Sequence, residues 1–323
     1  FRYFDIGSDL LLDIYKTMVQ SRLLDQRVWQ LNRQGRAALV ASSQGHEALQ
    51  VASVYALRKG KDLFYTYYRD LAVMVALGVT PREIMLGYMA KSGEPMSGAR
   101  QFPTQGAMPD LGLVNLSNVV ATQLPQAVGA ALACVQQQSD SVVAVYFGDG
   151  AIEEGVFYES INFAVVKKLP VVFICENNLY SVYSNLNPRQ PYKRSISSLA
   201  KSIGVHSVKL DTDDIYKMYL GVKKNMKYVS NYNKPIFFEL MTYRYKEHCG
   251  PNNDDQLNYR SIKEINLWKK KDPLEKFLTK RLLSDKTIKK INKLVHKKTK
   301  KAFIFAENSK FPKMKNAYKK LYA

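Results

Sequence analysis

The sequence predicts an α/β fold in which a parallel sheet is flanked by helices, with helical extensions at both ends of the chain. Two short, apolar and β-branched segments, residues 141–147 and 170–175, are typical of buried strands. Residues 152–168 lie between them and have helical periodicity. This order indicates a βαβ unit, whose strands are parallel and whose crossover is right-handed. At 323 residues, the chain is long enough to bury a large core.

The segments ahead of this unit are predicted to be mainly helical. Ser8 is expected to cap a helix over residues 9–34, and two further helices are expected over residues 42–57 and 81–90. Residues 91–112 are rich in glycine and proline, so we expect them to form an irregular connection.

The sheet is expected to run from about Val119 to Thr242, and residues 236–241 are expected to form its last buried strand. A loop and a helical tail follow. We interpret the whole chain, residues 1–323, as one domain with four parts: N-terminal helices and connection (1–118), sheet core (119–242), loop (243–262) and C-terminal helices (263–323).

A short motif follows each of the two strands of the βαβ unit. Gly148-Asp149-Gly150 comes after the first strand, and Asn177-Asn178 comes after the second. Ligands of parallel sheets bind beyond the carboxyl ends of the strands, and glycines let a ligand approach the backbone. Mg²⁺ prefers oxygen ligands and is commonly shared between protein carboxylates and phosphates. The pattern therefore predicts a magnesium–diphosphate site that includes Asp149 and Asn178.

Gly-Asp-Gly followed at this distance by Asn-Asn is similar to the thiamine diphosphate motif. The chain resembles the α subunit of the 2-oxo acid dehydrogenase E1 component from about Asp9 to Tyr322. The resemblance implies the thiamine diphosphate-binding fold. The segment 117–129 resembles branched-chain members in particular, which implies a branched-chain 2-oxo acid as substrate; pyruvate and acetoin dehydrogenases are the close alternatives.

The same resemblance implies a set of site residues. Mg²⁺ would be held by Asp149, Asn178 and the backbone carbonyl of Tyr180, and the diphosphate by Arg69 together with Tyr68. Further cofactor contacts would come from Gly148, Gly150, Ala151, His248 and the backbone of Val120. A monovalent cation, K⁺, would be held by Ser117, Thr122 and Gln123.

The catalytic residue implied by the resemblance is His248, which follows the family-like segment Thr242-Tyr243-Arg244. An imidazole with an ordinary pKa suits proton transfer near neutral pH. The loop 246–262 has few apolar residues, so we expect it to be loosely held when no cofactor is bound. One departure concerns Gln105, which stands where branched-chain members have a histidine; glutamine cannot transfer a proton near pH 7.

The implied activity is oxidative decarboxylation of a 2-oxo acid with transfer of the acyl group to a lipoyl group. The implied partners are an E1 β subunit in an α2β2 heterotetramer, which would supply the glutamate that activates the thiamine ring, and the lipoyl domain of an E2 component. Three widely spaced cysteines favour a reducing compartment, either the cytoplasm or the mitochondrial matrix. No run of 18 apolar residues predicts a membrane span.

The formal net charge of +20 raises a different hypothesis, a non-catalytic basic binding protein on the same fold. Residues 1–165 hold 13 basic and 15 acidic residues, whereas residues 166–323 hold 35 basic and 13 acidic residues. The excess is mostly lysine between apolar positions of the predicted C-terminal helices. No recognition motif accompanies it, so we interpret it as a solvated face without specific nucleic-acid binding.

Overall fold

The computed structural model describes residues 7–103 and 105–318. Its centre is a six-stranded sheet with the order β2-β1-β3-β4-β8-β7, and every neighbouring pair is parallel. The strands are β1 (Leu63–Tyr67), β2 (Leu113–Ser117), β3 (Val143–Gly148), β4 (Val171–Asn177), β7 (His206–Leu210) and β8 (Ile236–Met241), and a small hairpin is formed by β5 (Tyr180–Ser181) and β6 (Ser184–Asn185). The parallel α/β sheet predicted from the sequence is confirmed.

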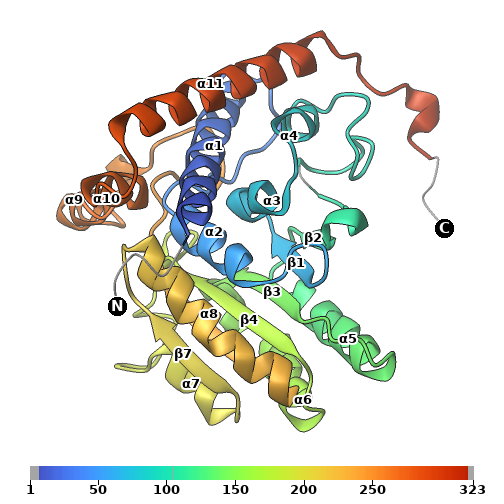
Figure 1. Cartoon of the computed structure of the whole chain (residues 1–323), viewed down its shortest axis with the longest axis vertical. Helices are drawn as coiled ribbons and strands as arrows, with labels where there is room; N and C mark the ends of the chain where they lie inside the picture. The colour runs from blue at the N-terminus through green and yellow to red at the C-terminus, as the bar shows by residue number, and fades with distance from the viewer. Residues whose placement is uncertain (1–6, 104, 319–323) are drawn as a thin grey trace.

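Helices cover both faces of the sheet (Figure 1). One face is covered by α1 (Ser8–Arg33), α2 (Glu47–Ala56), α3 (Leu71–Leu77) and α8 (Ile215–Tyr232), and the other by α5 (Gln123–Gln136), α6 (Gly155–Val166) and α7 (Ile196–Ser202). The outer helices are α4 (Pro81–Tyr88), α9 (Ile262–Lys269), α10 (Pro273–Thr279) and α11 (Asp285–Asn308).

The strand β3 shows why two layers of helices are needed. Its side chains alternate between the faces: Ala144 and Tyr146 join the core under α2 and α8, whereas Val145 and Phe147 join the core under α5 and α6. All four are fully buried. A strand that is apolar on both faces is stable only between two layers, as is usual in parallel sheets.

The structure corrects three details of the sequence interpretation. Ser8 does not cap the first helix, because it lies inside α1 and Gly7 occupies the capping position without a side-chain hydrogen bond. The helix predicted from residue 152 begins at Gly155, because extended backbone at Glu154 separates it from a 3-10 turn. Two strands, β1 and β2, lie ahead of the expected start of the sheet near Val119.

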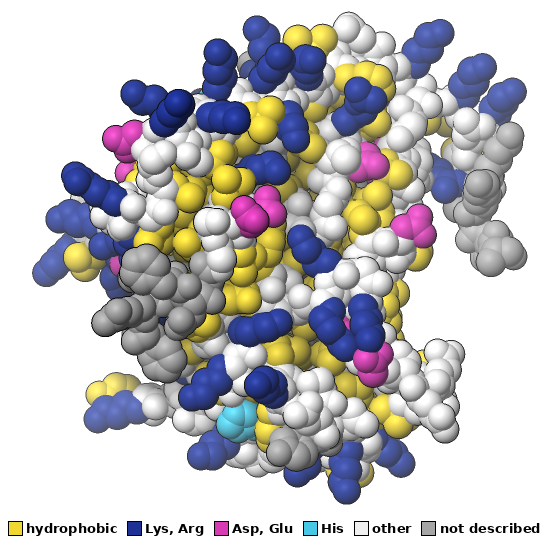
Figure 2. All heavy atoms as spheres, viewed as in Figure 1, with side chains coloured by type: hydrophobic (Ala, Val, Ile, Leu, Met, Phe, Trp, Pro, Cys, Tyr) yellow, Lys and Arg dark blue, Asp and Glu magenta, His cyan; other side chains and the backbone are white. Residues whose placement is uncertain are grey.

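The C-terminal helices pack on the N-terminal ones. Figure 1 shows α11 crossing α1 and α4 at the edge of the molecule. Ile291, Val295 and Ala302 of α11 are buried, whereas its lysines are exposed. On the face drawn in Figure 2, Lys and Arg side chains clearly outnumber Asp and Glu. Among the described residues, no helix combines the length and the apolar character needed to span a membrane.

Candidate active site

A small cavity of about 60 Å³ lies at the carboxyl ends of β1, β2, β3 and β4. It is lined by Tyr67, Tyr68, Arg69, Ser117, Val119, Val120, Ala121, Gln123, Phe147, Gly148, Asp149, Gly150, Ala151, Asn178, Tyr180, Ser181 and His248. All the site residues expected from the sequence are in this set except Thr122, whose hydroxyl bonds Ser117 at the cavity wall. Segments far apart in the sequence therefore meet at one edge of the sheet.

Asp149 reaches this edge on a 3-10 turn, η3 (Asp149–Glu153), that directly follows β3. Its side chain is buried, and burial raises the pKa of the carboxyl group although Arg189 lowers it. Gly150 is required by packing as well as by any ligand, because a Cβ there would lie 2.7 Å from Oγ of Ser181. The motif thus presents one buried carboxylate at the cavity.

Arg189 is the partner of Asp149, and no pattern in the sequence predicts this pairing. Its Nη2 lies 2.5 Å from Oδ2 of Asp149, and its Nη1 lies 2.6 Å from Oε1 of Glu153. The guanidinium group is nearly buried. Arg189 follows the β5–β6 hairpin, in a polar segment without periodicity or motif. The pairing gives this buried carboxylate a counter-ion from the chain itself.

The two asparagines of the second motif differ in their contacts. Asn177 bonds Glu239 through Nδ2 and the backbone N–H of Leu179 through Oδ1, so it fastens β4 to the neighbouring strand β8. Asn178 instead lines the cavity, and its Oδ1 accepts a hydrogen bond from the backbone of Tyr180. Because an amide oxygen has two lone pairs, one can still bind a cation.

Arg69 is buried and held from two sides. Its Nη1 donates to the carbonyl of Ser42 at 2.8 Å, and its Nη2 donates to the carbonyl of His248 at 2.9 Å. Its Nε has no hydrogen-bond partner among the described residues. Leaving a buried guanidinium N–H unpaired is costly, so an anionic ligand at this position would be stabilised.

His248 lies between two arginines, and its pKa differs from the sequence expectation. Burial and then the charges of Arg69 and Arg244 lower the pKa of His248 to about 3. The imidazole is therefore neutral near pH 7 when the cavity holds no anion. Nη2 of Arg69, which can only donate, lies 3.4 Å from Nδ1. This geometry favours the tautomer that carries its proton on Nε2.

The loop 246–262, expected to be loosely held, is fastened by charged groups. Asp254 is buried and pairs with Arg260, whose Nη1 also donates to the carbonyl of Arg244 at 2.6 Å. The backbone N–H of Gly250 donates to the carbonyl of Val40 at 2.8 Å. A buried ion pair is therefore one anchor of this loop, which a search for apolar anchors does not find; the mobility of the loop without cofactor stays a prediction.

Three oxygen-bearing side chains gather beside the cavity where a monovalent cation was expected. Oγ of Ser117 and Oγ1 of Thr122 lie 2.6 Å apart, and both are within hydrogen-bond distance of the carbonyl of Val119, so one hydroxyl donates to the other and the other can donate to the carbonyl. Oε1 of Gln123 is buried without a hydrogen-bond partner among the described residues. By contrast, Gln105 is not among the residues that line the cavity.

These contacts fit a diphosphate with a divalent cation. A buried carboxylate, an amide oxygen and a backbone carbonyl are hard oxygen ligands suited to Mg²⁺, and Arg69 offers an unpaired N–H to a phosphate. Among the described residues, no cluster of three or more His, Cys, Asp and Glu could hold a metal on its own.

Comparison with known proteins agrees with this geometry. Residues 15–315 match the family model described as the dehydrogenase E1 component. The chain belongs to the dehydrogenase E1 component family. The resemblance to 2-oxo acid dehydrogenase E1 α subunits stated from the sequence is confirmed, and with it the dependence on thiamine diphosphate that the family implies.

Several relatives share most of the chain. It is 38% identical to a 2-oxoisovalerate dehydrogenase subunit alpha of Bacillus subtilis, over 81% of this chain and 79% of that protein. It is 31% identical to the mitochondrial 2-oxoisovalerate dehydrogenase subunit alpha 2 of Arabidopsis thaliana, over 99% of this chain and 68% of that protein. A mitochondrial relative of Macaca fascicularis is 31% identical over 95% of this chain and 69% of its own length.

Proposed function

We propose that this chain is the α subunit of a branched-chain 2-oxo acid dehydrogenase E1, with 2-oxoisovalerate among its substrates. The proposal is supported by the relatives named 2-oxoisovalerate dehydrogenase and by the resemblance of residues 117–129 to branched-chain members. Pyruvate and acetoin dehydrogenation are the nearest alternatives. A basic binding protein without catalytic activity is not favoured, because a buried carboxylate and a buried arginine converge on one cavity.

In this proposal, Asp149, Asn178 and the carbonyl of Tyr180 hold Mg²⁺, and Arg69 with Tyr68 holds the diphosphate. Val120, Gly148, Gly150 and Ala151 contact the cofactor, while Ser117, Thr122 and Gln123 hold K⁺. Thiamine diphosphate, when bound, supplies the carbon nucleophile that adds to the 2-oxo group and takes up electrons as CO₂ leaves. The chain orients the bound cofactor and neutralises the charge of its diphosphate.

His248 acts as a hydrogen-bond donor in this proposal. Its pKa of about 3 keeps it neutral, and the contact with Arg69 leaves the proton on Nε2, from which it can donate to an anionic oxygen during acyl transfer. A bound diphosphate would offset the charges of Arg69 and Arg244 and so raise the pKa of His248 toward neutrality. The cofactor would thereby prepare His248 for proton transfer.

We propose that this chain supplies only half of the active site, and we call this the half-site model. The observation that carries it is the set of residues that line the cavity. None of the described residues that line it is a glutamate, although thiamine chemistry in this family needs one. Val119 and Val120 at the same cavity are 65% and 49% exposed, and apolar side chains at a polar site favour cover by another subunit. A β subunit in an α2β2 assembly would supply both the missing glutamate and the cover over these valines. A lipoyl domain of E2 would then receive the acyl group. In a eukaryotic host, the mitochondrial matrix is the expected location, as the name of the plant relative indicates for that protein.

The test is reconstitution with the cognate β subunit. We expect cofactor-dependent and Mg²⁺-dependent decarboxylation of 2-oxoisovalerate with an artificial electron acceptor, and none from either subunit alone. Pyruvate and acetoin are assayed in parallel, and a higher kcat/KM for either would replace the branched-chain assignment. Turnover by the α chain alone would contradict the half-site model.

A further inference from the structure

A buried carboxylate, Glu176, joins two parts of the active site that the sheet itself does not connect. Glu176 is in β4, directly before Asn177-Asn178, and is fully buried. Its Oε2 accepts three hydrogen bonds: from Nδ1 of His46 at 2.7 Å, from the hydroxyl of Tyr67 at 2.9 Å and from Nε2 of Gln50 at 3.0 Å. None of these side chains belongs to a strand next to β4.

The bond from Tyr67 crosses an intervening strand. Tyr67 ends β1, and β3 lies between β1 and β4 in the sheet. Gly148 of β3 pairs in register with Glu176. A Cβ on Gly148 would lie 3.9 Å from the hydroxyl of Tyr67, so the phenol passes over this glycine. A side chain much larger than alanine would occupy that path.

Gln50 provides a second connection to the same segment. Its Nε2 also lies 3.1 Å from the carbonyl of Arg69 and 3.2 Å from Oδ1 of Asp70, so its two protons are shared among Glu176 and these two acceptors, and its Oε1 accepts from the backbone of Ala72. Oδ2 of Asp70 in turn accepts from the backbone N–H of Tyr67. The turn that carries Tyr68 and Arg69 is therefore linked to Glu176 directly through the side chain of Tyr67 and indirectly, through Gln50, at the backbone of Arg69.

We propose that Glu176 is a positioning residue that holds the diphosphate-binding turn at Arg69 in register with the metal-binding segment at Asn178. The inference rests on the proposed function, since it concerns how this chain binds thiamine diphosphate with Mg²⁺. Diphosphate and metal are bound together, so a relative shift of the two segments weakens both contacts. Side chains that are already fixed before the ligand binds lose less conformational entropy on binding, so the ligand binds more tightly.

The test compares two buried tyrosines in neighbouring strands. Tyr67→Phe removes the hydroxyl that bonds Glu176, and Tyr146→Phe removes a hydroxyl that bonds Oγ of Ser53 at 3.0 Å rather than Glu176. Both changes remove one buried hydrogen bond and keep the ring. Calorimetry with thiamine diphosphate and Mg²⁺, on the α chain assembled with its β subunit, measures the dissociation constant.

We expect Tyr67→Phe to raise the dissociation constant about fivefold, the effect of one net hydrogen bond, and Tyr146→Phe to leave it unchanged. Glu176→Gln should raise it at least as much, and the double variant with Tyr67→Phe should be no weaker than Glu176→Gln alone, because both act through one contact. At saturating cofactor, kcat of Tyr67→Phe should fall by a smaller factor than the dissociation constant rises, because a positioning residue acts on binding first.

Other results separate the two proposals. If the wild-type assembly binds the cofactor and Tyr67→Phe behaves as Tyr146→Phe does, the positioning role is wrong and the proposed function stands. Additive effects in the double variant would also overturn it. If the wild-type assembly does not bind thiamine diphosphate with Mg²⁺, both proposals are wrong.

Discussion

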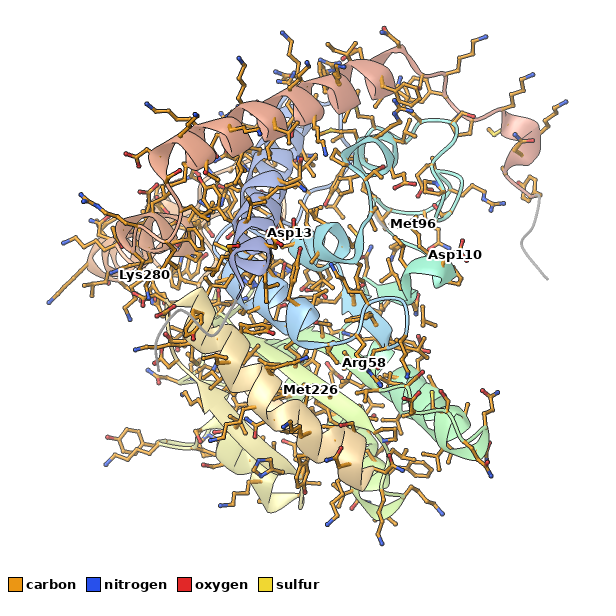
Figure 3. The ribbon with its side chains drawn as sticks, viewed as in Figure 1. Asp13, Arg58, Met96, Asp110, Met226 and Lys280 are labelled. Carbon is orange, nitrogen blue, oxygen red and sulfur yellow. The ribbon has the colours of Figure 1, made fainter. Side chains whose placement is uncertain are left out.

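The two edges of the central sheet differ in how many of their charged side chains are buried. At the carboxyl edge, Arg69, Asp149, Glu176 and Arg244 are almost completely buried. At the amino edge, an apolar groove lies between α2 and α8; its lysines remain exposed to water, and its buried carboxylate Asp62 is paired with Arg58. Figure 3 labels Arg58 and Met226, which line this groove. Charges in water cost little, whereas a buried charge costs several kcal/mol unless it is paired. The difference indicates that the buried charged side chains at the carboxyl edge serve ligand binding rather than solubility.

The largest expected effect is the loss of the metal carboxylate. Asp149→Ala should weaken thiamine diphosphate binding in the presence of Mg²⁺ at least about 100-fold, because it removes the single acidic ligand. Asp140→Ala is the matched control, since Asp140 is an exposed carboxylate at the amino edge that pairs with Lys61 and Arg58. Calorimetry on the assembled subunits measures both, and equal affinities would remove Asp149 from the metal site.

The next effect separates the two half-reactions. His248→Ala should lower acyl transfer to a lipoyl domain about 10- to 100-fold, because the variant lacks the Nε2 proton that the proposal uses. Decarboxylation with an artificial acceptor should fall much less. Steady-state rates in the two assays are compared. An equal fall in both would assign His248 to substrate binding or decarboxylation.

A smaller effect concerns stability against pH. The folded chain resists protonation of His248, whose pKa is lowered to about 3, whereas the unfolded chain takes up that proton below about pH 6.5. This group therefore makes the protein less stable as pH falls from 6.5 toward 3. Since His248 is partly exposed, we expect about 1 kcal/mol or less between pH 7 and 5. Urea unfolding of wild type and His248→Gln should show the wild type losing more stability; equal losses would contradict the depressed pKa.

The smallest effect is expected at the amino edge. Lys217 and Lys224 are exposed, and no carboxylate among the described residues pairs with them. Replacing both with Gln should change the free energy of unfolding by less than about 0.5 kcal/mol and leave cofactor affinity unchanged. Urea unfolding and calorimetry measure these values. A large change in either value would mean that the charges of the groove matter for stability or cofactor binding, as those of the carboxyl edge are expected to.

The sequence predicts the βαβ unit and the gathering of its motifs well, because strand periodicity and glycine positions are local signals. It does not predict β1 and β2, since β1 (Leu-Phe-Tyr-Thr-Tyr) mixes polar and aromatic residues and its place in the sheet depends on β3. The partners Arg189 of Asp149 and Tyr67 of Glu176 are also missed. Each joins residues distant in the chain, and only the three-dimensional fold brings them together. The roles of the site residues stay predictions.

In the proposed function, the pairing of Arg189 with Asp149 would make metal uptake an exchange of ions rather than an addition. The carboxylate already has a counter-ion in the folded chain, and this guanidinium group is also bonded to Glu153. A Mg²⁺ ion that took its place would leave Arg189 with a second carboxylate partner, so the buried anion would be compensated both before and after metal binding. A divalent ion that arrives with a diphosphate would compete for the carboxylate better than a monovalent one.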